Sequence, residues 1–143
     1  MKSERRVQSQ DLIDAFKTAR YKVLEPELEL KIGEVSESLN KLLERYGCKS
    51  WAFITPFNPS SQVISNEENE SRFDSLRGEV KGRVSFEGQG GGQQDQWPLE
   101  KSLLILGISL LRAKRLGRKY GQDAIVFGYK NKRTELIILN DTL

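Results

Sequence analysis

The spacing of apolar residues divides the chain into helical and extended segments. Apolar positions three or four residues apart predict helices over residues 9–20, 34–46, 66–80 and 109–121. Runs that alternate, or that are apolar throughout, predict strands over residues 21–24, 28–32, 51–55, 83–87, 102–108, 124–129 and 134–139. This pattern predicts a single α+β domain that has a mixed sheet of about five to seven strands and about four helices.

Two of these strands are apolar on both faces, which is typical of strands covered on both sides. They span residues 51–55 and 102–108, and we expect both to be central in the sheet. Residues 21–24 and 28–32 are separated by Pro26 and predict a hairpin at the sheet edge. Asn66 is the predicted N-cap of the helix over residues 66–80, and Ser109 that of the helix over residues 109–121.

Two segments lack a hydrophobic period. We expect residues 1–8 to be a flexible N-terminus that precedes a domain of residues 9–143. The second segment is rich in glycine and glutamine, starts at Gly88 and ends before Trp97. It is predicted to be a flexible loop of low complexity, and it lacks the spacing of a phosphate-binding P-loop.

The helix predicted over residues 66–80 carries polar groups on its buried side. At 100 degrees per residue, Asn69 lies within about 40 degrees of the apolar residues of this helix, and Arg72 lies about 60 degrees to one side. Burial of an amide or guanidinium without partners costs on the order of kcal/mol. We therefore expect both groups to meet polar atoms near the sheet.

The turn before this helix offers the nearest polar atoms. It leaves a central strand and leads to a helix N-terminus, where ligands gather in open α/β sheets and where backbone N–H groups favour anions. Its polar residues are Thr55, Asn58, Ser60 and Ser61. One interpretation is a pocket in which Thr55, Asn58, Asn69 and Arg72 bind a small anionic or amide-bearing ligand. The alternative is structural: Asn69 bonds the turn backbone, and Arg72 pairs with a carboxylate.

Glu100 precedes the second central strand and reaches the same site if the two strands are neighbours and suitably oriented. A carboxylate in a concave, partly apolar site can act as a general base, so one hypothesis is a hydrolase or transferase with Glu100 as the catalytic residue. The alternative is an Arg72–Glu100 ion pair that holds the fold. The residue pattern leaves open whether the protein is an enzyme, and it points to no particular cofactor.

Composition narrows the possible functions. The chain has 143 residues, of which 37% are hydrophobic and 30% charged, a globular composition. It contains no histidine, which excludes histidine-dependent triads and histidine-ligated zinc. Cys48 is the single cysteine, so no intramolecular disulfide or cysteine-rich zinc cluster can form, and we predict no metal site. The lack of a long apolar run or a signal-peptide pattern predicts a cytoplasmic protein that does not enter membranes.

Basic residues gather near the C-terminus. Residues 112–133 hold eight basic side chains and one acidic residue, Asp123. On the outer face of the predicted helix these include Arg112, Arg115, Arg118 and Lys119. A solvated basic face is the commoner explanation of such a pattern. The alternative is a nucleic-acid-binding module in which this face attracts phosphates.

Several motifs follow one another in a distinctive order. They are Trp51-Ala52-Phe53-Ile54-Thr55, Asn58-Pro59, Asn69 with Arg72, Trp97 with Glu100, residues 104–107, and Gly121-Gln122 before residues 124–128. In this order the chain resembles a bacterial family, domain of unknown function 3293, over roughly residues 10–139. The resemblance places four polar residues in the family pattern: Asn58, Asn69, Arg72 and Glu100. It implies no activity. Pro56-Phe57 replaces the Ala-Trp that is more frequent in the family, and an aromatic residue is kept.

Overall fold

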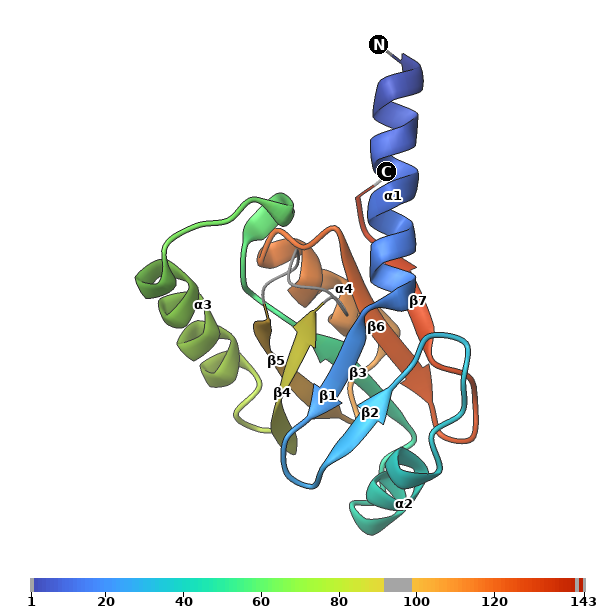
Figure 1. Ribbon diagram of the computed structural model, residues 1–143. Coiled ribbons are helices and arrows are strands. Elements are labelled where there is room, and N and C mark those ends of the chain that lie inside the picture. Colours follow the sequence, from blue (N-terminus) through green and yellow to red (C-terminus); the bar gives the residue numbers. More distant parts are fainter. Residues whose placement is uncertain (1, 92–98, 141, 143) are drawn as a thin grey trace.

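The computed structural model describes residues 2–91, 99–140 and 142, with side chains from residue 10 onward (Figure 1). These residues form seven strands and four α-helices. The strands are β1 (Arg20–Val23), β2 (Leu28–Leu30), β3 (Ser50–Ile54), β4 (Ser85–Gly91), β5 (Glu100–Leu106), β6 (Ala124–Tyr129) and β7 (Glu135–Ile138). The helices are α1 (Lys2–Thr18), α2 (Glu37–Arg45), α3 (Asn66–Glu79) and α4 (Leu110–Lys119). The predicted α+β fold is confirmed.

The strands form one sheet in the order β2-β1-β4-β5-β3-β6-β7. Every pairing between neighbouring strands is antiparallel. The mixed sheet expected from the sequence is therefore wrong in this respect. The reason is that α3 leads from β3 to β4 and α4 from β5 to β6, and each crossover passes over one strand. Strands β3 to β6 with these two helices therefore make a β-α-β-β-α-β unit. The predicted central strands β3 and β5 are neighbours, and the β1–β2 hairpin lies at one edge.

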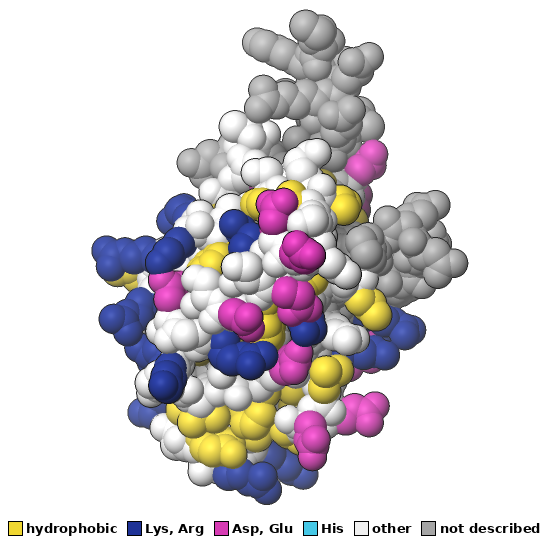
Figure 2. Space-filling model, turned by 90° about the vertical axis from the view of Figure 1, so that its left-hand side faces the viewer, with side chains coloured by type: hydrophobic (Ala, Val, Ile, Leu, Met, Phe, Trp, Pro, Cys, Tyr) yellow, Lys and Arg dark blue, Asp and Glu magenta, His cyan; other side chains and the backbone are white. Residues whose placement is uncertain are grey.

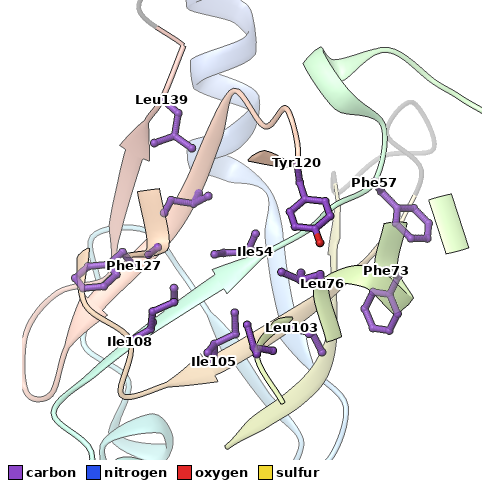
Figure 3. Packing of buried hydrophobic residues seen from close by; sticks show 14 residues of the cluster. Ile54, Phe57, Phe73, Leu76, Leu103, Ile105, Ile108, Tyr120, Phe127 and Leu139 are labelled. Carbon is purple, nitrogen blue, oxygen red and sulfur yellow. The ribbon is translucent and has the colours of Figure 1, made fainter. Parts of the chain in front are cut away.

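Helices α3 and α4 cover one face of the sheet. Alternation along the strands turns Ile54, Ile105 and Phe127 toward this face, where they are fully buried. Phe73 and Leu76 of α3 are buried in the same cluster, which Figure 3 shows from close by. This face carries one of two hydrophobic cores, and its contacts pack α3 against the sheet.

The opposite face lies inside a curl of the sheet. The backbone N–H of Gly33 donates to the carbonyl of Thr134 at 2.8 Å, and the N–H of Thr134 donates to the carbonyl of Glu34 at 2.9 Å. These bonds bring the end of the hairpin edge to the start of β7, so the two edges of the sheet meet at one end. The inner face is filled by Phe53 and Leu104, with α2 at one end of the curl and α1 at the other (Figure 1).

Helix starts differ in part from the sequence prediction. The first helix begins at Lys2 and not at Ser9. The N-cap of α3 is Ser65 and not Asn66, because the Ser65 hydroxyl accepts from the backbone N–H of Glu68 at 3.2 Å and its backbone is extended. Ser109 caps α4 as predicted.

The predicted glycine loop is wrong over its first part. Gly88, Gly90 and Gly91 belong to β4, which pairs with β1 on one side and β5 on the other. The physical reason is close packing: a Cβ added to Gly88 would lie 2.7 Å from the Phe53 ring. The rest of the predicted loop, residues 92–97, lies outside the described residues.

Candidate ligand-binding site

A strained turn follows β3 near the centre of the sheet. Asn58, Ser60 and Ser61 all adopt left-handed backbone conformations, with φ values of 49°, 55° and 59°. Positive φ is uncommon outside glycine, and such residues persist only where surrounding contacts hold them. Because strain of this kind concentrates at functional sites, the turn of residues 55–61 is a candidate site.

Asn69 holds the turn from α3. Its Oδ1 accepts from the backbone N–H of Asn58 at 2.8 Å, and its Nδ2 donates to Oδ1 of Asn58 at 2.8 Å. Asn58 Oδ1 also accepts from the backbone N–H of Ile64 at 3.1 Å. Asn69 is 3% exposed, so the inward orientation predicted from the helical period is confirmed. The oxygen and the nitrogen of the Asn69 side-chain amide thus both bond to the turn.

Arg72 joins the same turn to the end of α4. Its Nε donates to the Pro56 carbonyl at 2.7 Å, and its Nη2 donates to the Tyr120 carbonyl. The guanidinium carbon also lies 5.5 Å from the centre of the Tyr120 ring. None of the ion pairs among the described residues joins Arg72 to Glu100. Arg72 therefore bridges two backbone segments in place of the predicted ion pair.

The segment after α4 fixes the turn from the other side. Gln122 Nε2 donates to the Phe57 carbonyl at 2.9 Å, and the Ser60 N–H donates to the Gly121 carbonyl at 2.7 Å. The Ser61 hydroxyl donates to Asp123 Oδ2 at 2.7 Å. Together with the contacts from α3, these bonds explain how the strained backbone is held in one conformation.

Glu100 reaches the turn from β5. Its Oε2 accepts from Asn58 Nδ2 at 2.8 Å, a contact made possible because β3 and β5 are paired with Ile54 opposite Leu103. The Thr55 hydroxyl ties the two strands further, since it donates to the Lys101 carbonyl at 2.7 Å. The condition on which Glu100 could join the site, that the two strands are neighbours, is met.

A pocket of about 490 Å³ lies between α1 and the inner face of the sheet. Thr55, Asn58 and Glu100 line it. Asn69 and Arg72 are not among its lining residues; they hold the turn from behind. The structure thus separates the five predicted residues into three that line the pocket and two that support the turn.

Comparison with known families matches this chain to one family model, described as protein of unknown function (DUF3293), over residues 54–125. The match covers just over half of the chain. The chain belongs to the DUF3293 family. Neither the comparison with curated proteins nor that with solved structures gave a match. The matched stretch begins at the end of β3 and ends in β6, so it contains the strained turn together with Asn69, Arg72 and Glu100.

Sequence reasoning missed much of the pocket in this DUF3293 protein. The missed lining includes Tyr21 from β1, Phe53 from β3, Gly90 from β4, Ser102 from β5, and Ala15 and Phe16 from α1. One available signal was alternation, because Phe53 in β3 and Thr55 just after it are two residues apart and both line the pocket. No comparable local signal places Tyr21 opposite Gly90, a contact that depends on the pairing of β1 with β4.

Tyr21 gives the DUF3293 protein a testable pH dependence. Burial, and secondly the negative charge of Glu100, raise the pKa of its hydroxyl. The hydroxyl donates to the Phe16 carbonyl. The folded state thus keeps this proton at a pH where tyrosine in the unfolded chain, with a pKa of about 10, has begun to lose it. Stability contributed by Tyr21 is therefore present below about pH 10 and is lost as the pH rises further.

We expect Tyr21→Phe to cost about 1 kcal/mol at neutral pH through the lost hydrogen bond. It should also remove a decline in stability of up to about 1.4 kcal/mol per pH unit above about pH 10. Urea denaturation across this range measures both effects. Tyr129→Phe is the control, since that side chain is 46% exposed. An alkaline slope that is the same in Tyr21→Phe and wild type would contradict the prediction.

The residues of the nucleic-acid alternative lie on α4, away from the pocket lining. Arg112, Arg115 and Arg118 are exposed, whereas Lys119 pairs with Glu79. Figure 2 faces α3 and shows acidic and basic side chains intermixed there. Nucleic-acid binding by the basic face of α4 stays a prediction.

Among residues 2–91, 99–140 and 142, no helix has the length and apolarity needed to cross a membrane. Within the same residues, no group of three or more His, Cys, Asp or Glu side chains is placed to hold a metal ion.

Proposed function

We propose that this protein binds a small organic molecule in the pocket between α1 and the inner face of the sheet. The observation that carries the proposal is the pocket itself, about 490 Å³ in volume, in which apolar walls meet a few polar groups. Ligand sites in proteins have this size and this composition. The function is therefore binding of a ligand that has an apolar body and one polar end.

The apolar walls come from both sides of the pocket. Leu12 and Phe16 line the pocket from α1, and Phe53 and Val126 line it from the sheet. The sheet residues are nearly inaccessible, at 3% exposure each, so this wall is part of the packed core. Transfer of an apolar ligand body from water to such walls supplies a favourable free energy that grows with the area buried.

The polar groups come from the strained turn and β5. Thr55 and Asn58 lie beside Glu100, and Ser102 is two residues farther along the same face of β5. The turn is held by Asn69, Arg72 and the segment after α4, so its polar groups are fixed before any ligand arrives. Fixed groups lose little conformational entropy on binding, which favours affinity. Asn69 and Arg72 thus support the site and need not touch the ligand.

Filling the pocket tests the proposal. A Cβ at Gly90 would lie 3.4 Å from the Tyr21 ring and 3.6 Å from the Phe53 ring, which are ordinary contacts, so a larger side chain there extends toward the pocket. Small organic fragments that bind the wild-type protein should raise its melting temperature, and we expect Gly90→Leu to abolish this rise. Gly78→Leu is the matched control, because a Cβ at this exposed position of α3 meets nothing within 4 Å.

Ala15→Trp fills the same pocket from α1 and guards against a folding defect peculiar to Gly90→Leu. Both pocket variants should fail to respond to fragments that stabilise wild type and Gly78→Leu. The proposal is wrong if every stabilising fragment shifts folded Gly90→Leu and Ala15→Trp as much as it shifts wild type.

A further inference from the structure

We infer that the ligand's polar end is an organic ammonium ion; this rests on the proposed function of the pocket. Asp11 and Glu100 are the charged residues among the described pocket lining, and both are acidic. Asp11 comes from α1 and Glu100 from β5, so the negative charges lie on two separate elements. A site lined in this way favours a cation over an anion.

Aromatic rings occupy the wall beside these carboxylates. Tyr21 and Phe53 line the pocket and make an edge-to-face contact, with ring centres 5.7 Å apart. Phe16 adds a third ring from α1. Aromatic faces attract ammonium groups, and the combination of rings with a carboxylate is how proteins recognise organic cations. Glu100 acts electrostatically on this wall, since its charge contributes to the raised pKa of Tyr21.

The hydrogen bonds of the turn favour the same class of ligand. Asn58 Oδ1 already accepts from the Ile64 N–H and from Asn69 Nδ2, and Thr55 Oγ1 accepts from the Phe57 N–H and donates to the Lys101 carbonyl. The polar atoms of the turn are thus engaged in holding its backbone. The carboxylate of Glu100 accepts from Asn58 Nδ2, and a carboxylate can accept several hydrogen bonds at once.

This inference departs from the anionic or amide-bearing ligand expected from the sequence. That expectation placed the ligand at the N-terminus of α3, but no residue of α3 is among the described lining of the pocket. The protein carries a net charge of +3, which by itself attracts anions to the molecule as a whole. A preference for a cation would therefore have to come from the acidic residues of the pocket. Comparing the affinities for a cation and an anion thus separates the effect of the pocket from that of the net charge.

Three probes that share one hydrocarbon chain test the ligand class: hexylamine, 1-hexanol and hexanoate, titrated at pH 7 and equal ionic strength. We expect hexylamine to bind at least about tenfold more tightly than hexanoate, with 1-hexanol between them. Glu100→Gln keeps an oxygen that can accept from Asn58 Nδ2, and should lower the affinity for hexylamine towards that for 1-hexanol. Glu67→Gln, an exposed change on α3, is the control and should leave all three affinities unchanged.

Asp11→Asn provides a second variant on a different element, in case Glu100→Gln does not fold; it too should weaken hexylamine and leave 1-hexanol unaffected. Hexanoate binding as tightly as hexylamine would overturn the cation inference. So would failure of all three probes in wild-type protein. The broader pocket proposal survives either result if other fragments still bind in a manner that Gly90→Leu abolishes, and it falls with the inference if none does.

Discussion

Asn69→Ala is expected to lower the free energy of unfolding by about 2–4 kcal/mol. The side chain is 3% exposed and makes two hydrogen bonds to Asn58, each 2.8 Å long. Alanine removes both bonds and leaves the buried N–H of Asn58 without its acceptor, which costs more than the loss of an exposed hydrogen bond. The loss also frees a turn whose left-handed backbone depends on such contacts.

Urea denaturation measures this change as a lower midpoint at an unaltered slope. Asn66→Ala is the matched control, the same substitution on the same helix at an exposed position, and should change stability by no more than about 0.5 kcal/mol. Equal losses in the two variants would show that the Asn58–Asn69 bonds do not hold the turn. Asn69 does not line the pocket, so Asn69→Ala can affect a ligand only through the turn. Any loss of ligand affinity in this variant should therefore accompany its loss of stability.

The part of the site that depends on local periodicity could be predicted from the sequence. The position of Asn69 relative to the apolar side of α3 follows from the helical repeat, and the turn after β3 follows from its prolines. These signals identify a polar group that must be satisfied, but not its partner. Asn69 bonds the backbone of the turn, as the structural alternative had it, whereas Arg72 donates to backbone carbonyls and not to the carboxylate that this alternative expected.

The pocket could not be predicted, because it depends on contacts between distant parts of the chain. Tyr21 meets Gly90 only after β1 pairs with β4, and the curl requires the bonds between Gly33, Glu34 and Thr134. No hydrophobic period within one segment encodes such a pairing. Glu100 was a conditional member of the site for the same reason, since its place depends on the register of β3 with β5.

The glycine-rich segment shows how composition can mislead. Several glycines within a few residues are typical of a flexible linker, because glycine gains most freedom in the unfolded chain. In β4, however, Gly88 and Gly90 face the inner core, beside the rings of Phe53 and Tyr21. There the missing side chain leaves room for an aromatic wall to lie against the strand backbone. In β4, Gly88 and Gly90 therefore make room for the aromatic rings and do not make the segment flexible.

Gly88→Ala and Gly90→Ala should therefore have different effects, although they lie two residues apart on one face of one strand. A Cβ at Gly88 would lie 2.5 Å from the backbone carbonyl oxygen of Lys22 and 2.7 Å from the Phe53 ring. Neither a strand backbone nor a ring that is 3% exposed can move freely, so we expect a loss of about 1–3 kcal/mol.

At Gly90 the nearest atom to a new Cβ is 3.4 Å away, and neither glycine has a positive φ. Gly90→Ala should accordingly be neutral or stabilising by up to about 1 kcal/mol, since alanine reduces the entropy of the unfolded chain without strain. Denaturation midpoints of the two variants measure the contrast directly. If both alanines stabilise the protein, the segment behaves as a linker would, and the close packing of Phe53 on β4 does not exist in solution. If only Gly88→Ala destabilises it, Phe53, which lines the pocket, packs closely on β4 in solution.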